Sequence, residues 1–301
     1  MSDPWLLLPD LLLIVVGWAV CRYTALDRGV WDGAERLVYY LLFPVLLFNS
    51  IVRSPLRAGD TLNLGLAALA VVASGIVLAH ALRLFRGVDA RMHASGAQTA
   101  FRFNSFIAFA LAERLAGAQG VAWVALMVAL CVPLCNVAAV WPLARHGGQP
   151  YVRELARNPL ILGTVAGLVC NFAGITFPRS VDVTLHRIGL AALPIGLMAV
   201  GAGLKFGGLR EAPRLAAALL AVKHALLPLV ALALAALLSL HGEQRLLVVG
   251  FAALPTASSA YVLAARMGGH GPFVAGLVTL STVIGMLGVP LWLAVAGWLS
   301  G

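Results

Sequence analysis

The chain has 301 residues, of which 61% are hydrophobic and 11% are charged, and its mean hydropathy is +0.95. Soluble domains carry about 25% charged residues. The composition therefore excludes most soluble enzyme classes and predicts an all-α integral membrane protein with the lipid bilayer as its solvent. The net charge of +9 is scattered between apolar runs without a block of basic residues, so we expect no nucleic-acid partner.

Ten apolar runs follow one another along the chain, and each is long enough to cross a hydrocarbon core of about 30 Å, which takes ~20 helical residues. They lie at residues 5–22, 35–52, 62–82, 91–116, 120–143, 158–175, 183–204, 214–239, 244–266 and 272–298. The first run lacks a basic region and a cleavage site, so it is interpreted as a retained span rather than a signal peptide.

The basic residues predict how these ten spans are oriented. The odd-numbered loops carry 13 Lys and Arg residues and the even-numbered loops carry 6. Basic loops face the cytoplasm. With an even number of spans, both termini are then predicted on the outer side.

The four cysteines lie inside apolar runs and are interpreted as small buried residues rather than as a disulfide framework. Cys131 and Cys135 are one helical turn apart, but no His or carboxylate is close to them in sequence. We therefore expect no metal site and no cofactor.

A repeat at an offset of 150 residues relates the two halves of the chain. The matched pairs are Pro9 with Pro159, Gly17 with Gly167, Asp32 with Asp182, and Pro44 with Pro194. One residue of slippage then aligns Asn104 with Pro255 and Gly117 with Gly268. Five spans are an odd number, so the second copy must enter from the opposite face, which is the inverted-repeat architecture of secondary transporters. The predicted units are a first repeat at 1–143, a cytoplasmic connecting loop at 144–157 and a second repeat at 158–301.

The fourth span carries polar residues at its centre, namely Arg102, Asn104 and Ser105. An intramembrane arginine is costly and usually faces a protein interior or an aqueous cavity, although it can also bond backbone carbonyls freed by a broken helix. Asn and Ser are good N-cap residues, so an unwound turn here could start a second half-helix.

The equivalent point of the ninth span is Pro255, which is followed by Thr256, Ser258 and Ser259. Proline breaks a helix unless it occupies the first helical position; a simple kink is the alternative. Since the fourth span runs outward and the ninth inward, two half-helix N-termini would meet and offer partial positive charge and unpaired N–H groups to an anion.

Two further polar residues lie inside spans. Lys223 in the eighth span could add a cation to the anion site, balance Asp10, or line a water pocket. Asn49 in the second span faces either a neighbouring helix or the cavity. Because sodium sites need several oxygen ligands and proton relays usually need a buried carboxylate or His, ion coupling has little support in the sequence.

Several stretches together resemble the auxin efflux carrier family of membrane transporters, including its bacterial members. They are FRFNSFIAFALAERLAG in the fourth span, NPLILGTVAGLV in the sixth, ALPIGLMAVGAGL in the seventh, Lys223 with Pro228 in the eighth, ALPTASSAYVLAARMGG in the ninth, and STVIGMLGVPLWLA near the end. The resemblance covers nearly the whole chain.

The resemblance implies ten helices in two inverted five-helix repeats, with a scaffold of helices 1, 2, 6 and 7 and a transport part of helices 3–5 and 8–10. Broken helices 4 and 9 cross at the site, where plant members bind a carboxylate. Many bacterial relatives have Asn near the position of Ser259, so serine here departs from the pattern. The fourth span also lacks a proline at its break, and the long loop of plant carriers is absent, as expected of a compact inner-membrane form.

We therefore expect a multi-pass inner-membrane transporter of a small organic anion, auxin-like or another mono- or dicarboxylate, which works by alternating access as a homodimer. The candidate substrate-binding residues are Arg102, Asn104, Ser105, Pro255, Thr256, Ser258, Ser259, Asn49 and Lys223. The sequence offers no catalytic constellation, so an enzyme is not expected. A sodium-coupled symporter of the bile-acid type and a non-transporting anion sensor remain as alternatives.

Overall fold

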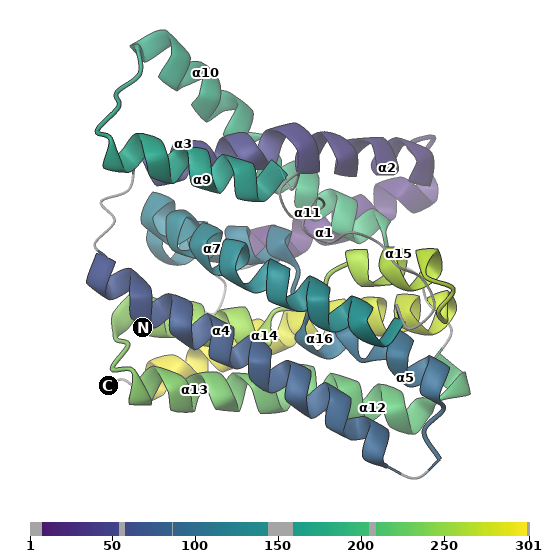
Figure 1. Cartoon of the computed structure of the whole chain (residues 1–301). Helices are drawn as coiled ribbons and strands as arrows, with labels where there is room; N and C mark the ends of the chain where they lie inside the picture. Colours follow the sequence, from purple (N-terminus) through teal and green to yellow (C-terminus); the bar gives the residue numbers. More distant parts are fainter. Residues whose placement is uncertain (1–7, 54–57, 86, 144–158, 205–208, 300–301) are drawn as a thin grey trace.

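A computed structural model describes residues 8–53, 58–85, 87–143, 159–204 and 209–299, and these residues form helices and short connections without strands. Figure 1 shows the helices along the chain. In the first half they are α1 (Leu8–Tyr23), α2 (Arg28–Leu37), π-turn η1 (Val38–Leu42), α3 (Phe43–Arg53), α4 (Ala58–Ala81), η2 (Leu82–Leu84), α5 (Ala90–Gly96), α6 (Gln98–Phe101) and α7 (Ser105–Leu143).

The second half is likewise helical. It contains α9 (Pro159–Phe172), α10 (Arg179–Leu190), α11 (Ala192–Ala202), η4 (Leu209–Glu211), α12 (Pro213–Ala221), π-turn η5 (Val222–Leu226), α13 (Leu227–Leu237), α14 (Gly242–Ala253), α15 (Ser259–Arg266) and α16 (Gly271–Trp298). The predicted connecting loop at 144–157 lies outside the described residues.

Six helical runs within the described residues are long and apolar enough to cross a membrane. They are Arg28–Arg53, Leu62–Leu84, Ala90–Ala139, Arg179–Ala202, Pro213–Leu237 and Gly271–Trp298. Leu11–Tyr23 and Leu162–Phe172 are shorter apolar helices. These runs confirm an all-helical membrane protein.

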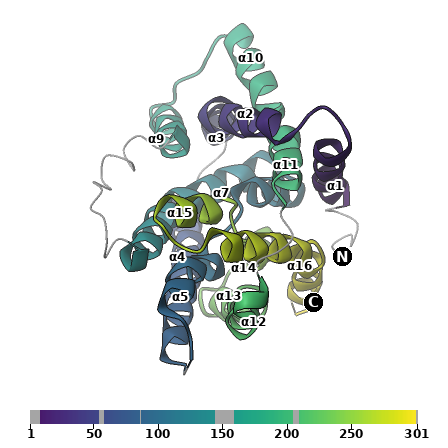
Figure 2. The ribbon, with the colours of Figure 1, turned by 90° about the vertical axis from the view of Figure 1, so that its right-hand side faces the viewer.

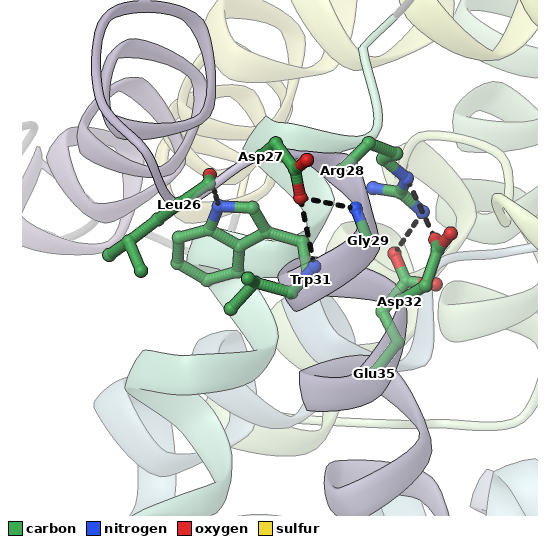
Figure 3. A network of polar contacts seen from close by, with 8 residues as sticks. Leu26, Asp27, Arg28, Gly29, Trp31, Asp32 and Glu35 are labelled. Atoms are coloured by element: carbon green, nitrogen blue, oxygen red, sulfur yellow. Dashed lines mark hydrogen bonds and ion pairs between the residues drawn. The ribbon is translucent and has the colours of Figure 1, made fainter.

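The helix of the second predicted span begins seven residues before its apolar run, at Arg28 instead of residue 35. Asp27 explains the earlier start, since its Oδ1 accepts the N–H groups of Gly29 at 2.9 Å and Val30 at 3.3 Å. Figure 3 shows this N-cap beside the Arg28 guanidinium, which binds Asp32 and Glu35, each at 2.9 Å. The prediction was too short because it followed hydrophobicity, and this first turn is charged.

Two π-turns precede prolines of the second and eighth spans. The N–H of Phe43 reaches back to the Val38 carbonyl, and Pro44 follows at once. In η5 the N–H of Leu227 reaches the Val222 carbonyl, directly before Pro228. Since proline has no N–H and collides with the preceding turn, the helix widens just upstream of it.

The helices pack in two groups (Figure 2). In the first group, α1 packs on α11, α3 packs on α9 and α10, and α2 packs on α11. In the second group, α4, α7, α13, α14 and α16 pack on one another, with α15 on α16. The groups meet where α7 contacts α3 and α11, with Phe43 stacked on Phe106 at 4.9 Å between ring centroids.

Glycines bring α1 and α11 into backbone contact. A Cβ built on Gly201 would lie 1.8 Å from the Ile14 carbonyl oxygen, and one on Gly17 would lie 1.9 Å from the Met198 carbonyl oxygen. Any side chain at either position would force the helices apart. Small residues at such crossings allow membrane helices to gain close van der Waals contact.

Candidate functional site

The helix of the fourth predicted span is broken between Phe101 and Ser105. Arg102 is extended (φ −72°, ψ 150°), and Asn104 caps the helix that follows. The Asn104 Oδ1 accepts the N–H groups of Phe106 at 3.0 Å and Ile107 at 3.3 Å. The predicted half-helix start is confirmed, and its cap is Asn104. The break therefore needs no proline.

The ninth predicted span is broken between Ala253 and Ser259. Pro255 lies in the break and has no N–H to donate. The next N–H group, that of Thr256, donates to the Ser281 Oγ of α16 at 3.0 Å. The segment 254–258 is thus held by a neighbouring helix in place of its own helical hydrogen bonds.

The two breaks touch each other. The Asn104 N–H donates to the Pro255 carbonyl at 2.8 Å, and the Thr256 hydroxyl lies 3.4 Å from the Arg102 carbonyl. Segments about half the chain apart are therefore joined backbone to backbone, and the first turns of α7 and α15 begin beside this junction. Each helix start carries roughly half a positive charge. The Asn104 side chain accepts the first N–H groups of α7, and the Ala257 and Ser258 carbonyls accept those of Ala260 and Tyr261 in α15.

Arg102 bridges elements at this junction and is only 9% exposed. Its Nη1 donates to the Ser259 Oγ at 3.1 Å, and its Nη2 donates to the Asn136 Oδ1 at 2.9 Å. The guanidinium thus ties the start of α15 to the second part of α7. It places a fixed positive charge at the junction, and these two hydrogen bonds go to side chains.

Lys223 lies on the π-turn η5, is 3% exposed, and belongs to a segment that packs against α6 and α14 beside both breaks. Lys223 and Arg102 both lie near the Cys135 thiol, which bonds the Phe101 carbonyl at 3.6 Å. No described carboxylate forms an ion pair with Lys223. The side chain of Asp10, its suggested partner, lies outside the described residues.

The remaining predicted site residues are divided between the two helix groups. Ser105 and Ser258 are half-buried and Ser259 is exposed at the start of α15, so all three lie at the junction. Asn49 lies in α3 of the first group and is buried. Among the described residues, no hydrogen bond joins Asn49 to the breaks.

Sequence reasoning missed Ser281 and Gln98. Ser281 is 1% exposed and receives the Thr256 N–H, whereas the Gln98 Nε2 donates to the Ala260 carbonyl at 3.2 Å. An isolated serine or glutamine in an apolar helix gives no local signal of such a partner. The same holds for Asn136, which follows Pro133 by three residues in α7 and accepts a hydrogen bond from Arg102.

A small apolar pocket of about 20 Å³ lies between the two helix groups, beside Pro255 in the second break. It is lined by Leu11, Ile14, Ile107, Ala110, Leu197, Pro255, Thr282, Gly285, Met286 and Val289. This is room for about one water molecule. Within the described ranges, no three His, Cys, Asp or Glu side chains gather as a metal site would require.

Residues 145–293, about half of the chain, match the family described as "Membrane transport protein". The chain belongs to this family. It is the auxin efflux carrier family predicted from the motifs, and its members are transporters rather than enzymes.

Two relatives are similar to this membrane transport protein over 94% of its length and 94% of their own. One, from Rhizobium meliloti, is 24% identical and is named "Putative malonate transporter". The other, from Methanothermobacter thermautotrophicus, is 22% identical and is named "Uncharacterized transporter". Together with the apolar helical runs, these matches identify a membrane protein of a transporter family.

Proposed function

We propose that this protein is a secondary carrier of a small organic anion and binds the anion where the breaks of the fourth and ninth spans meet. The observation that carries the proposal is the Asn104 to Pro255 hydrogen bond of 2.8 Å, which brings two helix starts together beside a buried arginine. Helix N-termini and guanidinium groups are the recurring ligands of carboxylates.

Asn104 supplies the specific donor in this proposal. Its Oδ1 is occupied by the first turn of α7, so the Nδ2 group points its two donors elsewhere, and no described group accepts them. An anion at the junction would take this amide and lie beside the positive end of α15, where the N–H groups of Ala260 and Tyr261 already donate to the Ala257 and Ser258 carbonyls. Arg102 and Lys223 supply positive charge, while Ser105, Thr256, Ser258 and Ser259 offer hydroxyl groups.

The substrate in this proposal is a mono- or dicarboxylate, and malonate is the first compound to test because one relative is named as a malonate transporter. Two cations near one thiol, Arg102 and Lys223, favour an anion with more than one negative charge. The pocket beside Pro255 holds too little space for malonate, so the carrier must open between its helix groups to load it.

The proposed architecture is ten spans in two inverted repeats, 1–143 and 158–301, with both termini outside the inner membrane. Two matched contacts support it. Gly17 approaches the Met198 carbonyl, and Gly167 approaches the Phe48 carbonyl, at 3.2 Å from a built Cβ. Each residue of the second contact is related to one of the first by the offset of 150, as a repeat requires.

Two ion pairs of the first helix group also correspond under the offset of 150 residues. Asp182 binds Arg53 at 2.6 Å, and the repeat equivalents of these residues are Asp32 and Gly203. Glycine cannot supply the cation, but the Arg28 Nη1 lies 3.2 Å from a Cβ built on Gly203. Arg28 thus takes the place of an arginine side chain at that position and binds Asp32.

Alternating access in this proposal moves the second helix group, as the transport part, against the first, as the scaffold of a homodimer. The contact between the groups is suited to sliding. In it Phe43 stacks on Phe106 and lies tilted against Phe109, and the Phe106 ring packs against Gly196. Apolar surfaces can shift without breaking directional bonds.

The test is uptake of labelled malonate, succinate and acetate into proteoliposomes by purified protein. Asn104→Ala should abolish saturable uptake with normal expression, whereas Asn63→Ala, which removes an exposed amide that donates to the Leu238 carbonyl, should behave as wild type. Unchanged transport by Asn104→Ala would contradict the site.

The same assay separates the alternatives. Uptake that requires sodium would favour the symporter of the bile-acid type. Binding that raises the melting temperature without any flux would favour the sensor. Flux that follows only the anion gradient and does not saturate with anion concentration would indicate a channel.

A further inference from the structure

We propose that His224 and Ser281 are positioning residues of the anion site and set the backbone of segment 254–258. This inference rests on the proposed function, and neither residue was assigned a role there. It is carried by a continuous chain of hydrogen bonds that begins on α16, passes through the π-turn η5 and ends at the break.

The first hydrogen bond of this series joins α16 to the backbone of His224. The Trp292 Nε1 donates to the His224 carbonyl at 2.9 Å, which fixes the π-turn against α16. The His224 Nε2 lies 2.8 Å from the Ser281 Oγ. The ring also interacts with the backbone of Ala253, the last residue of α14, so Ser281 and Ala253 together orient it.

Ser281 connects His224 to the second break. Its oxygen accepts the Thr256 N–H at 3.0 Å, so its own proton is available for the His224 Nε2. The hydroxyl is 1% exposed, and water cannot readily replace it. Without this acceptor the Thr256 N–H would be buried and unsatisfied, because the preceding break has removed its helical partner.

Thr256 then holds the other break. Its hydroxyl lies 3.4 Å from the Arg102 carbonyl, and the preceding Pro255 carbonyl accepts the Asn104 N–H. Displacing Thr256 would therefore misplace Arg102 and Asn104, the groups proposed to bind the anion. His224 and Ser281 act through these residues and do not themselves contact the anion.

One turn after Ser281, α16 also packs closely against Pro255. A Cβ built on Gly285 would lie 3.0 Å from the Pro255 Cδ. Ser281 and Gly285 are four residues apart and so share one helix face. This face of α16 contacts the second break through the hydrogen bond from Thr256 to Ser281 and the close packing of Gly285 on Pro255.

The first measurement is the KM for malonate uptake in proteoliposomes. Ser281→Ala and His224→Leu should raise the KM about tenfold and leave the maximum rate within about twofold, since the anion site is loosened but not removed. Ser281→Thr retains the hydroxyl and His224→Gln retains a polar group near the Nε2 position, so both should restore the KM. The matched control is Thr99→Val, which removes a buried hydroxyl of α6 that donates to the Gly96 carbonyl at the end of α5.

The second measurement does not depend on substrate. Hydrogen–deuterium exchange of a peptide that covers 254–258 should be at least about tenfold faster in Ser281→Ala than in wild type or Thr99→Val. If Ser281→Ala does not fold, Ser281→Cys, which keeps a weaker acceptor, should give smaller changes in the same directions.

Unchanged KM in Ser281→Ala and His224→Leu would overturn the inference, and so would faster exchange without a change in KM, which would leave the pair only a structural role. Failure of the proposed function looks different: wild-type protein would not transport malonate, succinate or acetate, and Asn104→Ala would change no uptake.

Discussion

Arg102 shows how one residue can serve both structure and charge. Its two hydrogen bonds reach Ser259 and Asn136 on different elements, a task that suits the planar guanidinium fork and not the single ammonium of lysine. Arginine and lysine side chains, in contrast, both carry a positive charge. Substitution can therefore separate geometry from electrostatics at the proposed site.

We expect Arg102→Gln to raise the KM for malonate about 30-fold or more, because it removes the cation as well as the bridge. Arg102→Lys should have a smaller effect, about three- to tenfold. Concentration-dependent uptake in proteoliposomes measures both. Equal KM values for Lys and Gln variants would show that charge at this position does not contribute to binding.

Gly285 offers a second test at the scale of one residue. The methyl group of Gly285→Ala would press on the Pro255 ring, which cannot move freely because its carbonyl is bonded to Asn104. We expect a loss of about 1–3 kcal/mol in stability, as in other overpacked sites, together with a raised KM. Thermal unfolding and uptake measure these effects. Gly288→Ala, on the same helix with nothing within 4 Å of a built Cβ, is the control.

At the scale of helices, the crossing of α1 and α11 is built around Gly17 and Gly201. In Gly201→Ala the new Cβ would overlap the Ile14 carbonyl oxygen, so the helices must separate and lose packing along their contact. We expect destabilisation of about 3 kcal/mol, seen as a lower melting temperature and an early-eluting fraction in size-exclusion chromatography. Gly33→Ala, in open space on α2, should match wild type; equal losses in both would contradict a specific crossing.

The helix breaks and π-turns have different causes in different helices. Prolines explain the π-turns η1 and η5 and contribute to the second break. The first break has no proline and exists because Asn104 caps α7 while its N–H finds the Pro255 carbonyl. Local sequence thus supplied the cap, and a distant segment supplied the partner.

At the scale of the molecule, the proposal requires the second helix group to move against the first. Leu197 of α11 and Ile107 of α7 line the same pocket between the groups. In a background without native cysteines, the pair Leu197→Cys and Ile107→Cys bridged by mercuric ion should lose transport by more than about tenfold and regain it when excess dithiothreitol removes the mercury.

The control pair is Arg53→Cys with Asp182→Cys, whose parent side chains touch within the first group. Bridging this pair should leave malonate uptake intact, because both positions move together. Full uptake with the Leu197 and Ile107 pair bridged would mean that the groups do not need to separate at this pocket.

The sequence by itself determined the features that depend on neighbouring residues. Long apolar runs gave the helices, since backbone groups in lipid must bond within their own segment. Pro255 and the capping residue Asn104 marked the two interruptions, and the turn at Ala116 and Gly117 falls where the fourth and fifth runs were separated. The motifs indicated the transporter family.

Only the tertiary structure decided which groups complete the junction. Ser281, Asn136 and Gln98 become partners of the breaks because α16, α7 and α5–α6 pack there, and nothing in their own surroundings in sequence distinguishes them. Asn49, equally polar, was assigned to the other helix group. Hydrophobicity and capping act over a few residues, whereas a buried polar group is satisfied by whichever helix the fold brings within about 3 Å of it.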